Sequence, residues 1–148
     1  LHMHNGIGSG EDYDGDGEPD VWFDLHNDLF WFDTSPEWGE PGETHDPTLA
    51  LEDPDGAGPE RIEVPDPQKL AEYTLGVHCW SAFEYGPSVA TVKIYHFETL
   101  VKTLTDVVLQ SGDLWEVGTL TWPKAELVES VAPAGGPLIT PGYPNIFQ

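Results

Sequence analysis

Carboxylate side chains repeat at regular spacing in one loop near the start of the chain. This loop has the sequence Asp12-Tyr13-Asp14-Gly15-Asp16-Gly17-Glu18-Pro19-Asp20, with carboxylates at its first, third, fifth and ninth positions. Alternate side chains of such a loop converge on one centre, a glycine at the sixth position permits a sharp turn, and the seventh residue offers its carbonyl oxygen. The pattern predicts a Ca²⁺ site with ligands from Asp12, Asp14, Asp16, Glu18 and Asp20.

The surroundings of this loop distinguish it from an EF-hand. An EF-hand has a bidentate glutamate at the twelfth position, where this chain has Phe23, and its loop lies between two helices. The loop therefore resembles the helix-free calcium loops of integrin-type propeller repeats and thrombospondin type 3 repeats, which a strand follows directly. Asp24 is expected to complete the ligand shell. The competing interpretation is a solvated acidic linker that binds no metal.

A second group of carboxylates occupies the segment 52–60. Asp53, Asp55 and Glu60 are spaced among two glycines and two prolines, which favour a rigid turn. Two interpretations stay open for this segment. It wraps a second cation, or it is an ordinary turn built from the residues that turns prefer.

The net charge of the chain restricts its partners. There are 27 acidic residues against five basic ones, giving a formal charge of −22, and 19 of the acidic residues lie within the first 66 positions. Nucleic acid and anionic membrane surfaces would repel such a chain. Repulsion at this density destabilises a compact fold unless cations neutralise it. The charge therefore indicates bound calcium, a high-salt habitat, or both. No apolar run is long enough for membrane insertion.

Residues that could support catalysis are not arranged for it in the sequence. A zinc enzyme needs a compact ligand set, and the six histidines form no H-E-x-x-H spacing. No G-x-S-x-G motif is present, and Cys79, the single cysteine, falls on the apolar side of a predicted strand, as an inert buried thiol does. The chain is therefore predicted not to be an enzyme. The run His2-Met3-His4 is interpreted as a tag remnant that binds copper or zinc only adventitiously.

Short segments with a period of two dominate the chain and predict β-strands. In 72–80, Tyr73, Leu75 and Val77 alternate with polar residues, which is typical of a half-buried strand. Frequent glycine and proline suit short strands joined by turns, so we expect an all-β fold, an antiparallel, jelly-roll-like β-sandwich with long acidic loops. Its expected parts are an N-terminal segment with the calcium loop (1–20), the sandwich (21–123) and a Pro/Gly-rich tail (124–148). Further strands are predicted at 48–51, 61–64, 88–97 and 114–122, with a hairpin in 21–33 and a strand-turn-strand in 98–109.

Several short motifs between positions 21 and 123 resemble those of the YfaP-like family of bacterial secreted and surface domains. They are Asp24-Leu25-His26, Trp31-Phe32-Asp33, Asp46-Pro47-Thr48-Leu49, the turn 53–60, Gly76-Val77-His78, Tyr85-Gly86-Pro87-Ser88 and Gly112-Asp113-Leu114-Trp115. The resemblance implies a β-sandwich module with no established catalytic activity. It also implies that Asp24, Asp53, Asp55 and Glu60 lie near one another.

Together these observations predict a non-catalytic, calcium-binding module with a structural or adhesive role, located outside the cell or on its surface. It is expected to be a subunit of a surface or filamentous assembly, in which the apolar pairs 138–139 and 146–147 let copies of the chain join through terminal strands. The alternative is a calcium-stabilised carbohydrate-binding module that stacks glycans on exposed tryptophans. The candidates for that platform are Trp22, Trp31, Trp38 and Trp80, and Trp38, in a Pro/Gly loop, is the one least expected in the core. The competing interpretation is that most of these tryptophans are core residues.

Overall fold

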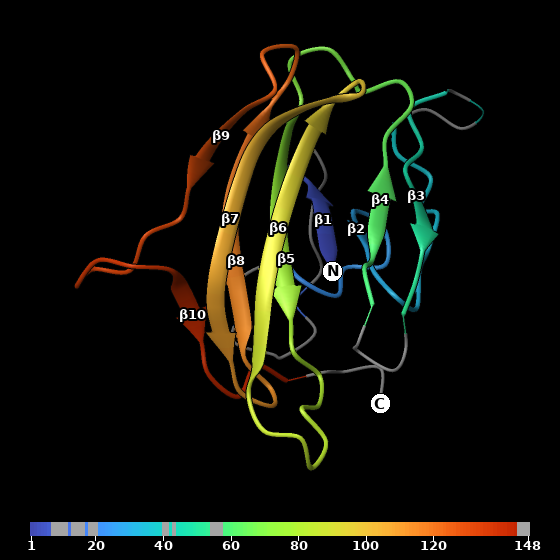
Figure 1. Ribbon diagram of the computed structural model, residues 1–148. Helices are drawn as coiled ribbons and strands as arrows, with labels where there is room; N and C mark the ends of the chain where they lie inside the picture. Colours follow the sequence, from blue (N-terminus) through green and yellow to red (C-terminus); the bar gives the residue numbers. More distant parts are fainter. Residues whose placement is uncertain are drawn as a thin grey trace.

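The computed structural model describes residues 1–6, 12, 17, 21–39, 42, 44–53 and 58–144. These residues form ten β-strands and no helix, which confirms the all-β class (Figure 1). The strands are β1 (His2–Asn5), β2 (Asp28–Leu29), β3 (Thr48–Leu51), β4 (Arg61–Glu63), β5 (Glu72–His78), β6 (Ser88–His96), β7 (Thr99–Leu109), β8 (Leu114–Thr121), β9 (Glu126–Glu129) and β10 (Leu138–Thr140).

Six of the strands form one antiparallel sheet. Its order is β10–β8–β5–β1–β2, and β9 pairs with β8 beside β10. The remaining four strands form two separate hairpins, β3–β4 and β6–β7, each a two-stranded sheet. In Figure 1 the long β6–β7 hairpin crosses in front of β5 and β8, and the β3–β4 hairpin lies beside it.

The alternation predicted for β5 divides the six-stranded sheet into two faces. Tyr73, Leu75 and Val77 point toward the two hairpins and join the apolar clusters under them. Leu75 packs in both clusters, so both hairpins cover the same face of the sheet. The sheet and the hairpins thus form two layers, with the larger part of the apolar core between them.

Trp38 is part of this core, where the sequence predicted an exposed side chain. It is 1% exposed and stacks on Tyr73, with ring centroids 5.4 Å apart and planes 18° from parallel. Met3, Leu29 and Ala71 complete the buried cluster around it. The prediction failed because the loop around Trp38 folds back over the sheet. The backbone N–H of Trp38 donates to the Asp46 carboxylate at 2.8 Å.

The opposite face of the sheet is covered by the loop that precedes β2. Trp22 and Phe23 from this loop pack with Phe30 and Leu114 in a third buried cluster. Gly76 of β5 makes room for them, since a Cβ atom there would lie 2.8 Å from the Trp22 ring. Trp22 is therefore also a core residue and not part of an exposed aromatic platform.

The N-terminal residues are an integral part of the sheet, so their interpretation as a tag remnant is wrong. The four residues of β1 are buried, and β1 pairs with β5 on one side and β2 on the other. At the other end of the chain, β9 and β10 both pair with β8. Strands outside the expected 21–123 segment thus belong to the same sheet. The pair 138–139, predicted to join another copy, already occupies β10, and 146–147 lie outside the described residues.

Two predicted elements differ in the structure. The hairpin expected in 21–33 is absent from these described residues, because 21–27 form turns and only Asp28–Leu29 pair, with β1. The strand-turn-strand expected in 98–109 is one continuous strand, β7. The hairpin turn lies at Phe97 and Glu98, and irregularities in the pairing with β6 accommodate Asp106, which has a φ of 64°.

The different burial of two tryptophans leads to a test of this fold. Replacing Trp38 by alanine is expected to lower the free energy of unfolding by about 3–5 kcal/mol, because it removes a buried aromatic side chain and leaves a cavity. Trp80, which is 52% exposed, is the matched control, and Trp80→Ala should cost less than about 1 kcal/mol. Urea unfolding of both variants measures the difference. Equal losses would contradict the burial of Trp38.

Candidate functional site

The structure describes two residues of the first acidic loop, Asp12 and Gly17. The backbone N–H of Gly17 donates to Asp12 Oδ2 at 3.0 Å, and Gly17 has a φ of 92°. A positive φ of this size strongly favours glycine, as the sharp turn at the sixth position of a calcium loop requires. The other four predicted ligands, Asp14, Asp16, Glu18 and Asp20, lie outside the described residues.

The second acidic segment closes through the same type of contact. The N–H of Gly58 donates to the Asp53 carboxylate across the same five-residue separation as in the first loop. A Cβ atom on Gly58 would lie 2.9 Å from Asp53 Oδ2, so the absence of a side chain permits this closure. This shared Asp-to-Gly spacing is visible in the sequence. Asp55 lies outside the described residues.

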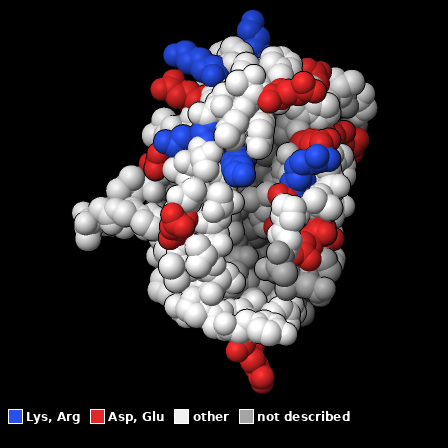
Figure 2. Space-filling view, in the orientation of Figure 1, with Lys and Arg blue, Asp and Glu red and all other residues white. Residues whose placement is uncertain are grey.

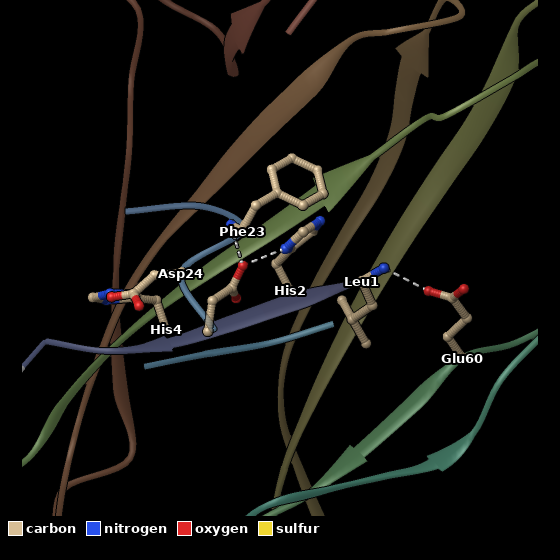
Figure 3. A network of polar contacts seen from close by, with 7 residues as sticks. Leu1, His2, His4, Phe23, Asp24 and Glu60 are labelled. Atoms are coloured by element: carbon tan, nitrogen blue, oxygen red, sulfur yellow. Dashed lines mark hydrogen bonds and ion pairs between the residues drawn. The ribbon is translucent and has the colours of Figure 1, made fainter. Parts of the chain in front are cut away.

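Glu60, the last predicted ligand of the second segment, bonds to the amino group of Leu1. Its Oε2 atom lies 2.6 Å from the Leu1 nitrogen. Figure 3 shows this ion pair at one end of β1, whereas Asp24 lies beside His4 toward the other end. The described residues therefore do not bring Asp24 and Glu60 together, in contrast to the grouping that the family resemblance implies.

Asp24 organises a buried turn. Its side chain is fully buried, Oδ1 accepts the N–H of His26 at 3.0 Å, and Oδ2 accepts from the side-chain amide of Asn27 at 2.8 Å. The Asp24 carbonyl also accepts the N–H groups of Asn27 and Asp28. Because both carboxylate oxygens hold the turn, Asp24 fits a structural role better than a calcium ligand. No group of three His, Cys, Asp or Glu side chains placed to hold a metal occurs among the described residues.

A buried histidine–carboxylate contact joins this turn to the sheet, and the sequence analysis missed it. His2 Nδ1 lies 2.7 Å from Asp28 Oδ2, which also accepts the N–H of Phe23 at 2.8 Å (Figure 3). Both side chains of the pair are at most 2% exposed. The available signal was the alternation of His2 and His4 around the apolar Met3, which is the pattern of a strand.

Two further histidines lie on the same face of the sheet. His4 Nε2 is 3.7 Å from Asp24 Oδ2, too far for a hydrogen bond, and His78 Nε2 has no hydrogen-bond partner among the described residues. Burial lowers the pKa of His4, although Asp28 and Asp24 oppose the shift. Burial, with His2 nearby, lowers the pKa of His78 to about 4. At neutral pH His78 is therefore uncharged, which suits its edge-on contact with the Phe23 ring.

A hollow of about 290 Å³ opens between the β6–β7 hairpin and the segment that follows β9. Leu104, Trp115 and Val131 contribute apolar side chains to its lining, and Glu129 is the one carboxylate there. Glu129 is paired with Lys102 at 2.5 Å. Thr105 and Ser130 also line the hollow, so it presents one carboxylate, already paired, among apolar and hydroxyl side chains.

Cys79 is buried, as the alternation in 72–80 predicted, and packs with Val107, Leu109 and Trp115. Its sulfur lies 3.7 Å from the Ser88 hydroxyl. This environment is apolar and lacks a described base near the thiol, so the contacts resemble those of a core side chain.

No protein family model, curated protein or solved structure matches this chain. The resemblance to the YfaP-like family therefore stays a prediction. Within the described residues there is no helix that is long and apolar enough to cross a membrane.

The low pKa of His78 makes stability depend on pH in a defined window. The unfolded chain binds a proton at this side chain near pH 6.5 and the folded chain only near 4, so the free energy of unfolding falls as the pH drops from 6.5 to 4. Allowing for partial solvation, the loss is about 2 kcal/mol.

Urea unfolding of the native chain and of His78→Gln at pH 7.5 and 4.5 tests this expectation. All ionisable side chains other than that of residue 78 are the same in both chains. The free energy of unfolding changes by a different amount between pH 7.5 and pH 4.5 in the two chains, and this difference isolates the contribution of His78. The variant should lose less stability on acidification, and identical losses would contradict the shifted pKa.

Proposed function

We propose that this chain is a non-catalytic, extracellular, calcium-binding β-module with a structural or adhesive role. The carrying observation is the closure of the first acidic loop, in which the carboxylate at its first position accepts the N–H of the glycine at its sixth. This contact brings the first and sixth positions of the loop together, as the sharp turn of a calcium loop requires. The second segment, closed by Asp53 and Gly58, is proposed as a further cation site.

Electrostatics favour the same proposal. The chain carries a charge of −22 and has a single cysteine, so no internal disulfide can hold its long loops. Divalent cations in the two loops would neutralise carboxylates where they are densest and would cross-link the loop backbone. Extracellular calcium is abundant enough to fill sites of modest affinity, which supports a location outside the cell.

Calcium titration tests this proposal directly. Saturating calcium is expected to raise the free energy of unfolding by about 3 kcal/mol at 100 times Kd, which corresponds to a rise in melting temperature of roughly 5–10 °C. Calorimetry measures the binding, and thermal melts in calcium and in chelator measure the stabilisation.

The control separates a specific site from general charge screening. Asp14→Asn/Asp16→Asn removes two predicted ligands, and Glu84→Gln/Glu98→Gln removes the same charge from exposed positions outside the loops. Only the first variant should lose the calcium effect. If sodium chloride at matched ionic strength stabilises all three chains as calcium does, the acidity serves salt adaptation and the proposal is wrong.

A carbohydrate-binding role is the second candidate, and one exposed aromatic pair favours it. Trp80 and Phe83 are both more than half exposed and lie edge to face, with centroids 6.1 Å apart. An exposed indole ring of this kind can stack on a sugar. A glycan array in calcium is the measurement: this candidate requires binding that Trp80→Ala abolishes and that Trp31→Ala, at the other exposed tryptophan, retains. Absence of any glycan signal would eliminate it.

A further inference from the structure

The layer that covers the core face of the six-stranded sheet is interrupted. It consists of the β6–β7 and β3–β4 hairpins, which share no strand pairing among the described residues. Figure 1 shows β6 and β4 as the neighbouring strands of the two hairpins, with β5 and β1 visible behind the space between them. We call this space the strand gap. Figure 2 shows the molecular surface hollowed between the two hairpins.

The floor of the strand gap is apolar and incompletely covered. Leu75 and Val77 lie in β5, in the interior of the sheet, and point toward the hairpins, yet both are only half-buried. Tyr73 of the same strand and Val117 of β8 face the same layer and are at most 2% exposed. Leu75, which packs in the clusters under both hairpins, and Val77 are therefore less completely covered than these neighbours on the same face.

Both sides of the gap present unpaired strand edges. β6 bonds to β7 and β4 bonds to β3, and within the described part of the chain neither strand bonds to another on its second edge. Such an edge is a template for another extended chain, because its N–H and C=O groups have no partner in the fold. A chain placed between β6 and β4 would meet donors and acceptors on both sides. It would also cover Leu75 and Val77.

Each strand that borders the gap carries one exposed basic side chain. Lys93 is exposed on β6 and Arg61 is exposed on β4, where it pairs with Glu63 at 3.0 Å. In Figure 2 Lys and Arg side chains lie on this face together with several Asp and Glu side chains. Residues of an added strand that point outward would therefore be favoured if they carried carboxylates, since oppositely charged cross-strand pairs are stabilising.

We propose that the strand gap binds an extended segment of another polypeptide by strand addition, completing the second layer in the order β7–β6–added strand–β4–β3. The segment carries apolar side chains at alternate positions, which pack on Leu75 and Val77. Its other side chains are neutral or acidic and face Lys93 and Arg61. This inference goes beyond the calcium-dependent role proposed above and does not depend on it.

The test uses a synthetic peptide as long as β6, blocked at both ends, with valine at alternate positions and glutamate or threonine at the others. Amide hydrogen exchange is measured with and without the peptide, in calcium and in chelator. The β6 and β4 amides that do not bond to β7 or β3 should exchange at least about tenfold more slowly when the peptide is bound. The outer edge of β7 is the internal control and should not change.

Two comparisons test the chemistry of the occupant. A peptide with a central proline should not bind, because proline removes a ladder donor. Lys93→Glu should weaken binding of the glutamate peptide by about fivefold and favour its lysine counterpart, whereas Lys124→Glu, the same change at an exposed turn, should do neither.

Three results would overturn the proposal. One is unchanged exchange of the β6 and β4 amides at saturating peptide. Another is equal protection along the outer edge of β7. The last is protection of the gap amides in the peptide-free protein that rises with protein concentration, which would assign the gap to a second copy of this chain. If the chain fails the peptide test yet binds calcium, the calcium proposal stands and the strand-gap proposal is wrong. If it binds the peptide but not calcium, the strand-gap proposal stands and the calcium proposal is wrong.

Discussion

The position of β1 between β5 and β2 is the constraint on which the rest of the structure depends. The four residues of β1 are buried, and their side chains contact the layers on both faces of the sheet. The contacts are apolar on one face and include buried polar groups on the other. On one face Met3 packs with Trp38 and Tyr73 under the β3–β4 hairpin. On the other face His2 contacts Asp28 and so holds the loop that carries Trp22 and Phe23. Removing this strand would expose both faces of the sheet at its centre.

Buried polar contacts lie on the face of the sheet opposite the two hairpins. They explain why the loop that precedes β2 has a defined conformation without regular secondary structure. A buried carboxylate is costly unless hydrogen bonds satisfy it. Asp24 satisfies that requirement within its own turn, and Asp28 Oδ2 does so with His2 and the N–H of Phe23. This need for hydrogen bonds distinguishes Asp24 and Asp28 from the carboxylates of the two acidic loops. Buried and already bonded, they are poor candidates for metal ligands, whereas Asp12 and Asp53 close loops near the surface.

The parts of the fold that were predictable are those whose sequence pattern is local. Alternation alone located β5, β6 and β8, and the composition predicted the all-β class. Trp38 could not be placed in this way, because its burial depends on a loop folding over a strand that lies far away in sequence. β1 was missed because His2 and His4 are polar, and only a partner such as Asp28 makes their burial favourable. The common closure of the two acidic loops follows from spacing that is visible in the sequence, although only the structure relates the two.

The strand gap and the acidity of the chain are connected by a physical argument. An unpaired edge invites pairing with any extended chain, and natural proteins often protect such edges with charge. Here the charge is placed unevenly, since most of the acidic residues lie in the first 66 positions, whereas β6 and β4 each carry one basic residue, Lys93 and Arg61. Copies of the chain repel one another through their net charge, which disfavours indiscriminate edge-to-edge association. A single extended segment carries far less charge than a second copy, so it can approach the same edges at a lower electrostatic cost. The acidity therefore disfavours a second copy of the chain at the gap more strongly than it disfavours a single extended segment.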